Sequence, residues 1–173
     1  MSFKTIKFHF LLTPIILLAS CAGYRIGETK PAVMKDVKTI DVKMFSNSSF
    51  QPRANAVATS AVTAAIVQDG TYRLASLDHA DAVLEGDLLS IKYTPVRGSR
   101  FNVLRPEELI NIVTLKWRLL NAKDPTKVVM EGTSVGFSEF FVSATLQTDR
   151  NNAVADAAQR AAANLVSTLS NGY

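Results

Sequence analysis

A short apolar segment near the start of the chain limits most strongly what the remaining residues can form. Residues 10–19 are almost wholly apolar, and Lys4 and Lys7 precede them without an acidic residue. A charged segment followed by a short apolar segment is typical of a signal peptide. A membrane-spanning helix needs about 20 apolar residues, so this segment is too short to span. We therefore expect the folded part of the protein to follow it.

The only cysteine of the chain, Cys21, follows the apolar segment directly. The sequence Leu-Ala-Ser-Cys that ends at Cys21 resembles the bacterial lipobox, which has a leucine three residues before the cysteine. The resemblance implies cleavage before Cys21, diacylation of its thiol and acylation of the new amine. Three acyl chains hold a protein on a membrane far more firmly than one. A secretory signal with an incidental cysteine, or a buried cysteine, is the alternative interpretation.

These features predict how the chain is organised. We expect residues 1–20 to be a lipoprotein signal peptide, residues 21–36 a lipidated tether, and residues 37–173 one folded domain. The mature chain would remain on a membrane without spanning it. Ala22, rather than an aspartate, follows the cysteine. By resemblance to the enterobacterial sorting rule, this favours the periplasmic side of the outer membrane.

The composition limits the classes of function open to the domain. Hydrophobic residues make up 47% and charged residues 20% of the 173 residues, as in ordinary globular proteins. The 19 basic residues outnumber the 15 acidic residues by too little to indicate nucleic-acid binding. One cysteine excludes an internal disulfide, and one cysteine with two histidines does not suit a structural zinc site. We expect no metal and no cofactor.

Seven segments carry periodic patterns of apolar residues. Alternation with a period of two predicts strands, and apolar residues three and four apart predict helices. The expected elements are a strand in 37–45, a helix in 52–69, a short strand in 72–76, strands in 82–93, 110–120 and 128–137, and a helix in 149–169. The apolar face switches at Leu88 and Leu89, which predicts a bulge. A polar loop is expected between residues 94 and 108.

This order of elements predicts the α+β class. The expected architecture is a two-layer sandwich with a mixed or antiparallel sheet of about four to five strands. Both helices are expected on one face of the sheet, and the first strand–helix–strand step can supply one parallel pair. The first helix is rich in alanine and therefore thin, so it can lie close to the sheet.

The sequence offers no recognisable catalytic group. His79 stands between Asp78 and Asp81, and a general base would need an oriented nucleophile beside it. We interpret it as a solvated turn histidine. Glu85 and Asp87 share one face of a strand, and we interpret them as part of a solvent-exposed face. The sequence therefore predicts a protein that is not an enzyme.

Basic residues are concentrated around the expected loop. Four cations occur within 14 residues that contain no acidic residue, and two more follow on one face of the next strand. They are Lys92, Arg97, Arg100, Arg105, Lys116 and Arg118. Arginine binds phosphate and carboxylate groups in a bidentate geometry, and interleaved apolar residues suit an amphiphile with an anionic head group. The alternative is a solvated loop whose arginines pair with Glu107, Glu108 or Glu85.

Several short segments in the first half of the chain resemble the lipopolysaccharide-assembly lipoprotein family, LptE. Their order and spacing carry the resemblance over about 70 residues, and the C-terminal helix fits less specifically. The segments are CAGYRI at 21–26, KTIDV at 38–42, FSN at 45–47, FQP at 50–52 and ADAVLEG at 80–86.

The resemblance implies a compact sheet with two helices on one side. It also implies an outer-membrane lipoprotein that plugs an LptD-like β-barrel translocon, assists its assembly and passes lipopolysaccharide to the cell surface. Family members contact the phosphates of this lipid through basic residues, and we assign that role to the six cations from their charge alone. The loop and residues 138–148 depart from the family pattern.

Two other functions remain open. A periplasmic lipoprotein that activates a peptidoglycan synthase also uses a small domain on a lipid anchor. Such a protein needs a long tether, whereas about 15 residues at about 3.3 Å each reach at most about 50 Å. A lipid-anchored hydrolase would need His79 beside Asp87 and a serine in a closed pocket. A barrel-binding lipoprotein that contacts lipopolysaccharide and no nucleic acid is the leading prediction.

Overall fold

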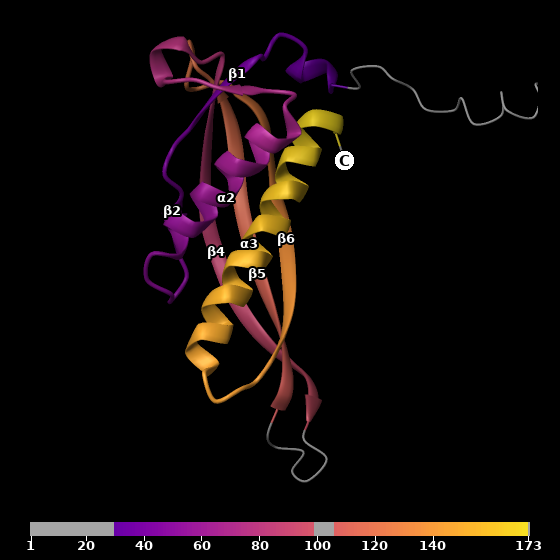
Figure 1. Ribbon diagram of the computed structural model, residues 1–173. Helices are drawn as coiled ribbons and strands as arrows, with labels where there is room; N and C mark the ends of the chain where they lie inside the picture. The colour runs from indigo at the N-terminus through magenta and orange to yellow at the C-terminus, as the bar shows by residue number, and fades with distance from the viewer. Residues whose placement is uncertain (1–29, 99–105, 173) are drawn as a thin grey trace, which may run out of the picture.

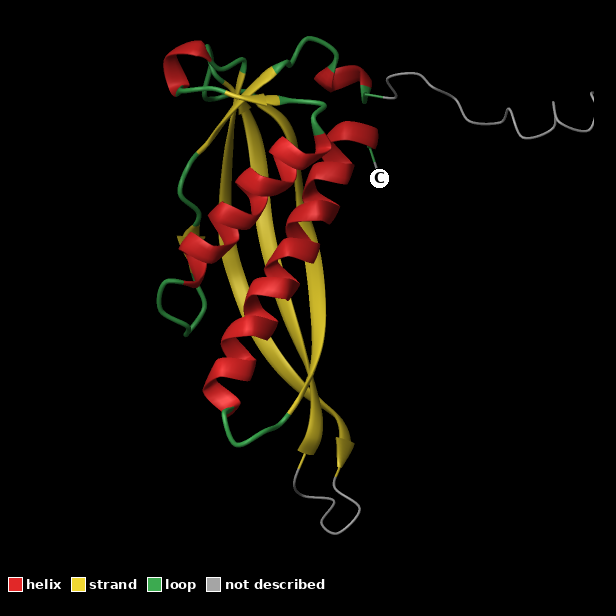
Figure 2. Cartoon of the chain, in the orientation of Figure 1, coloured by secondary structure: helices red, strands yellow, loops and turns green. Residues whose placement is uncertain are grey.

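The computed structural model describes residues 30–98 and 106–172 (Figures 1 and 2). Two 3-10 helices occupy Ala32–Met34 and Leu77–His79. The strands are β1 (Thr39–Val42), β2 (Ser46–Asn47), β3 (Arg73–Leu74), β4 (Ala82–Gly98), β5 (Pro106–Asn121) and β6 (Val128–Phe141). The two long helices are α2 (Ala54–Asp69) and α3 (Leu146–Asn171). None of the helices in these ranges is long and apolar enough to cross a membrane.

The strands form one mixed sheet in the order β3-β1-β4-β5-β6, and β2 pairs with β4 beyond the end of β1. β1 is parallel to β3 and β4, whereas β4, β5 and β6 form an antiparallel meander. Both long helices cover the same face of the sheet (Figure 2). This confirms the predicted α+β sandwich, with β2 as an additional short strand. We call the face under the helices the inner face and the opposite face the outer face.

The inner face is apolar because the strands alternate. Leu84, Leu88, Val113, Leu115 and Leu119 are all buried, as their spacing in the sequence predicts. The register of β4 and β5 shifts between Leu88 and Ser90, which confirms the predicted bulge. The buried residues of α3 that pack on this surface are Ala153, Val154, Ala157, Ala158, Ala161, Ala162, Leu165, Val166 and Leu169.

Alanines and one glycine bring the backbone of α3 close to the sheet. A Cβ atom on Gly136 of β6 would collide with the backbone of Ala157 and Ala161. We expected such a close approach for the first, alanine-rich helix, and this contact shows it at the second helix. Gly172 ends α3 with φ of 83°, and Gly70 ends α2 with φ of 75°, as the sequence predicts.

The prediction of a loop over residues 94–108 is wrong at both of its ends. β4 continues to Gly98, β5 already begins at Pro106, and Arg97 lies opposite Glu108 in the ladder. Beyond Leu88, the side of β4 that faces away from β5 pairs with no other strand in the described residues, so it is a sheet edge. Pro95 is tolerated there because proline has no N–H to donate, and a sheet edge needs none. The resulting hairpin extends past the helices (Figure 1).

Three other element boundaries differ from the expectation. β6 continues to Phe141, and α3 begins at Leu146 rather than near Asp149. α2 begins after Arg53, which has φ of 64°, so Pro52 precedes the helix. Met34 is fully buried within the segment that we expected to be tether. The folded part of the chain therefore includes residues before 37.

Candidate functional site

The predicted site residues divide into two groups. Cys21, Arg100 and Arg105 lie outside the described residues. Lys92, Arg97, Lys116 and Arg118 lie on β4 and β5, and the ladder register places all four on the outer face. The sheet alternation therefore brings these cations to the surface that the helices leave uncovered.

A cluster of charged residues covers the outer face near β1 and β2. We call it the charged cluster, and it consists of Lys43, Glu85, Asp87, Lys116, Arg118 and Glu131. Across the strands, Arg118 lies opposite Glu85 and Glu131, and Lys116 lies opposite Asp87. These six side chains line a shallow depression. Three cations and three carboxylates balance, so the cluster has no net charge.

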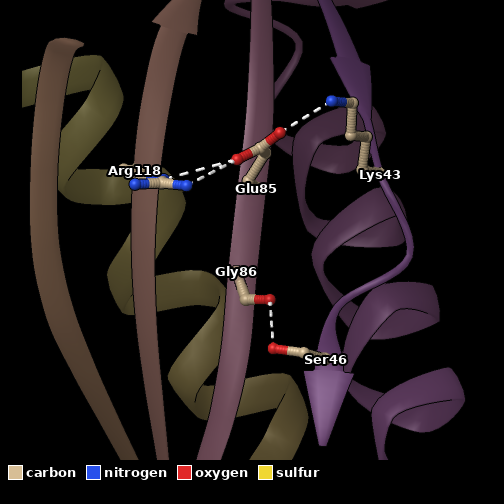
Figure 3. A network of polar contacts seen from close by, with 5 residues as sticks. All are labelled: Lys43, Ser46, Glu85, Gly86 and Arg118. Carbon is tan, nitrogen blue, oxygen red and sulfur yellow. Dashed lines mark hydrogen bonds and ion pairs between the residues drawn. The ribbon is translucent and has the colours of Figure 1, made fainter.

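Glu85 is the centre of this cluster, between β1 and β5 (Figure 3). Lys43 Nζ lies 2.6 Å from Glu85 Oε1, and Arg118 donates from Nε and Nη2 to Glu85 Oε2 at 3.3 and 3.1 Å. The Lys43 hydrogen bond and then the Arg118 hydrogen bonds hold the pKa of the Glu85 carboxyl below its usual value of 4.5. The carboxylate is therefore ionised at neutral pH and neutralises part of the charge of both cations.

Serines fix the second carboxylate of the cluster. Ser46 and Ser48 donate to Asp87 at 2.7 and 2.8 Å, and Ser46 Oγ also lies 3.4 Å from the carbonyl oxygen of Gly86. These contacts join the short strand β2 to the middle of β4. Glu85 and Asp87 are thus both held by hydrogen bonds within a polar surface whose formal charges balance.

Lys92 and Arg97 lie farther along β4, away from this cluster. Ile112, opposite Lys92, is separated from Lys116 by four residues of β5, which is about 13 Å. Glu108, opposite Arg97, is separated from Arg118 by ten residues, which is about 33 Å. The structure therefore does not unite the described cations in one phosphate site.

Both described arginines of the predicted site have acidic neighbours, as the alternative interpretation of the basic residues expects. Arg118 binds Glu85, and Arg97 Nε lies 3.9 Å from Glu108 Oε2 with its side chain 72% exposed. The Arg97 contact is long and exposed to solvent, so it holds the guanidinium only weakly. Binding of phosphate by these residues remains a prediction.

The hairpin half of the outer face is apolar as well as basic. Val135, Phe137 and Phe141 of β6 are exposed there, and Phe137 lies in one row with Ile112 and Lys92. These side chains were not predicted from the sequence, because alternation marks which face is buried and residues 135–141 carry apolar side chains on both faces. Their presence gives Lys92 and Arg97 the apolar neighbours that we expected from residues 101–104.

The residues weighed for catalysis do not come together in the described parts of the chain. His79 ends a short 3-10 helix, and its carbonyl oxygen accepts a hydrogen bond from Thr39. Asp87 is held by the two serines on another strand. Within the described ranges, no three His, Cys, Asp or Glu side chains are grouped so that they could hold a metal ion.

Comparison with protein families identifies the domain. The model of the LptE family, described as lipopolysaccharide-assembly, matches residues 37–169. The chain belongs to the LptE family. The match covers β1 to nearly the end of α3 and therefore includes both helices, the charged cluster and the long hairpin. No curated protein sequence matches this LptE-family chain.

Solved structures share the fold at low sequence identity. A hypothetical protein from Chlamydia trachomatis has a TM-score of 0.54 and 10% identity, with 79% of this chain and 97% of that chain covered. A protein from Xanthomonas campestris has a TM-score of 0.51 and 17% identity, with 83% and 90% covered. A minor lipoprotein from Acinetobacter baumannii has a TM-score of 0.50 and 11% identity, with 79% and 94% covered. These similarities establish the fold alone.

Proposed function

We propose that this LptE-family protein is a lipid-anchored protein of the outer membrane that binds an LptD-like β-barrel and fills its lumen. In this position it assists assembly of the barrel and delivery of lipopolysaccharide to the cell surface. The observation that carries the proposal is the family match over residues 37–169. The lipobox at Cys21 supplies the anchor.

The outer face supports a role as a plug. The lumen of a large outer-membrane barrel is polar, so a protein inside it needs a polar surface that also satisfies its own charges. The charged cluster fits this requirement, because Glu85 binds Lys43 and Arg118 while Asp87 binds two serines. Such a surface can pack on polar lumen residues while the Glu85 carboxylate stays paired with Lys43 and Arg118.

The hairpin half of the outer face supports contact with an amphiphile. Lys92 and Arg97 can reach phosphate groups, while Phe137 and Phe141 offer apolar surface in the same rows of the sheet. The groups that would meet the charged head and the apolar chains of one lipid thus lie on the same sheet face, on β4 and β6, with β5 between them. We assign lipopolysaccharide contact to this half and barrel contact to the half with the charged cluster.

Depletion of the protein in its own cells tests the proposal. We expect surface lipopolysaccharide to fall and the mature, oxidised form of the barrel to be lost, and both should return with a plasmid copy of the chain. A depleted strain with normal surface lipopolysaccharide and a normal barrel would contradict the proposal. Loss of peptidoglycan synthase activity alone would favour the regulatory lipoprotein instead.

A further inference from the structure

A small recess lies on the helix side of the sheet, between β4 and the first turns of α2 and α3. We call it the Tyr93 recess. It has a volume of about 280 Å³ and is lined by Phe50, Gln51, Ile91, Tyr93, Gln147 and Arg150. Sites for cofactors and drug-sized ligands have volumes of about 300–1,000 Å³. The recess therefore suits a single side chain of another protein better than a whole lipid or cofactor.

Unsatisfied polar groups concentrate at this recess. In the described parts of the chain, the buried side-chain atoms without a hydrogen-bond partner are Arg150 Nε and both amide atoms of Asn111. Arg150 lines the recess, and Asn111 lies opposite Tyr93 in the ladder of β4 and β5. Buried polar groups are nearly always paired in native proteins, so their accumulation around one tyrosine calls for a functional explanation.

Arg150 supplies the one charge that lines the recess. Its guanidinium lies 5.2 Å above the centre of the Tyr93 ring. No carboxylate of the described residues lies within 4.0 Å of this guanidinium, whereas Arg160, ten residues later on α3, binds Asp156 at 3.1 Å. A guanidinium that is held against an aromatic ring without an acidic partner keeps donors that can bind a carboxylate in a bidentate geometry.

The walls of the recess are fixed before anything binds. The Tyr93 hydroxyl donates to Gln51 Oε1 at 3.3 Å, and the ring meets Phe140 edge to face at 6.1 Å. Burial raises the pKa of the Tyr93 hydroxyl above its usual value of 10.0, so the hydroxyl stays protonated at neutral pH. Tyr93 and Gln51 therefore lose little freedom when a partner binds at the recess.

Phe50, at the edge of the recess, is fully exposed to solvent. Arginine and tyrosine are enriched among the residues that dominate protein–protein binding, and aromatic residues including phenylalanine are enriched at interfaces. Here an exposed aromatic side chain stands beside an arginine and a tyrosine that surround a hollow the size of one side chain. This combination indicates a protein partner, and the charge of Arg150 indicates that the inserted side chain is acidic.

We infer that the Tyr93 recess receives an aspartate or glutamate from a loop of a partner protein. The carboxylate binds the Arg150 guanidinium, and Phe50 covers the apolar atoms of the loop. The recess lies on the face opposite the charged cluster. The inference does not depend on which protein supplies the loop.

Photo-crosslinking from Phe50 tests the inference in the full chain in native membranes. Because Phe50 is fully exposed, p-benzoylphenylalanine can replace it without disturbing the core. We expect a crosslink to a partner peptide that contains an aspartate or glutamate within about three residues of the attachment point. In the same cells, R150M should lower the yield about tenfold or more, whereas R160M, the matched change on α3, should leave it unchanged.

Two controls keep the result specific. The thermal unfolding midpoint of R150M should match that of the parent chain, which separates loss of binding from loss of folding. Substitution of the partner's acidic residue by its amide should lower the crosslink yield as much as R150M does. If R150K gives part of the crosslink yield that R150M loses, this would further support recognition of the positive charge.

Three outcomes would overturn the inference. They are a crosslink yield that R150M leaves unchanged, an adduct with the mass of a lipid, and no adduct at Phe50. The outcome is independent of the proposed function. An acidic peptide from a protein other than a barrel would support the recess and contradict the barrel partnership. A barrel captured with no dependence on Arg150 would do the reverse.

Discussion

Arg118 on β5 donates from Nε and Nη2 to one carboxylate oxygen of Glu85 on β4, at 3.3 and 3.1 Å. This contact divides the basic residues of the outer face into two kinds. Arg118 belongs to the charged cluster, and its guanidinium is bound by Glu85 within the protein. Lys92 and Arg97 lie beyond it, in the same rows of the sheet as the exposed Phe137 and Phe141 of β6. The two halves of one sheet face therefore suit different partners, a polar protein wall and an amphiphile.

The membrane anchor gives the first prediction. Cells that express the chain in the presence of radioactive palmitate should yield a labelled band, and C21S should abolish the label. The reason is that only a thiol at this position can accept the lipid as a thioether. C21S should also shift the protein from the membrane fraction to the soluble fraction. An unlabelled parent chain that still sediments with membranes would contradict lipidation at Cys21.

The basic residues of the hairpin give the second prediction. Changing Arg97, Arg100 and Arg105 together to alanine should weaken binding of purified protein to lipopolysaccharide about threefold to tenfold at low salt, where surface charge acts most strongly. R118A should have a smaller effect because Glu85 already occupies this guanidinium. The exposed Lys127, changed to alanine, is the control at the opposite end of β5. Equal binding by the triple variant and the parent chain would exclude the hairpin as the lipid site.

The pH dependence of stability gives the third prediction, and it concerns Asp81. Its Oδ2 accepts hydrogen bonds of 2.9 Å from the backbone of Lys38 and from the backbone and hydroxyl of Thr39. The backbone N–H of Lys38, and then the Thr39 groups, lower the pKa of Asp81 below its usual value of 3.8. A lowered pKa in the folded state stabilises the fold above pH 3.8, and this contribution is lost as the pH falls through the folded value.

D81N should therefore destabilise the protein at pH 7 by about 1 kcal/mol, the contribution of a typical hydrogen bond. The difference between D81N and the parent chain should shrink below pH 3.8, where Asp81 of the unfolded parent takes up a proton before the folded parent does. Urea unfolding at pH 7 and pH 3 measures both values. D36N, at an exposed carboxylate just before β1, is the control. A difference that grows toward low pH would contradict the assigned role.

The buried amide of Asn111 gives the fourth prediction. Asn111 is fully buried, and neither of its amide atoms has a hydrogen-bond partner. An unsatisfied buried polar group costs about 1–3 kcal/mol, so N111V should raise the unfolding midpoint by about 2–4 °C or more. Valine also favours a strand. S138A, opposite Asn111 on β6, is the control. A lower midpoint for N111V would contradict a destabilising, unsatisfied amide at this position.

The sequence predicted those parts of the fold in which one face of an element is buried. The alternation of Val113, Leu115, Trp117 and Leu119 placed β5, and the glycines at 70 and 172 placed the ends of the helices. The sequence did not predict that β4 continues through Pro95. Whether proline is tolerated in a strand depends on which side of the strand is a free sheet edge, rather than on composition. That edge is a property of the tertiary fold.

The candidate site was predicted in the same uneven way. The positions of Lys116 and Arg118 on one face followed from strand alternation, but their balance by Glu85, Asp87 and Glu131 required the register of three strands. The Tyr93 recess was not predicted at all. It joins Gln51, Tyr93 and Arg150, which are about 40 to 100 residues apart, and no local pattern marks such a meeting.

Capture of the barrel from native membranes tests the central claim most directly. The full chain with a C-terminal affinity tag, solubilised from outer membranes in a mild detergent, should retain one large β-barrel protein in equimolar amount together with lipopolysaccharide. A charge reversal at the centre of the charged cluster, E85K, should reduce the amount of barrel retained. Recovery of soluble periplasmic proteins alone, or of a peptidoglycan synthase in place of the barrel, would contradict the account.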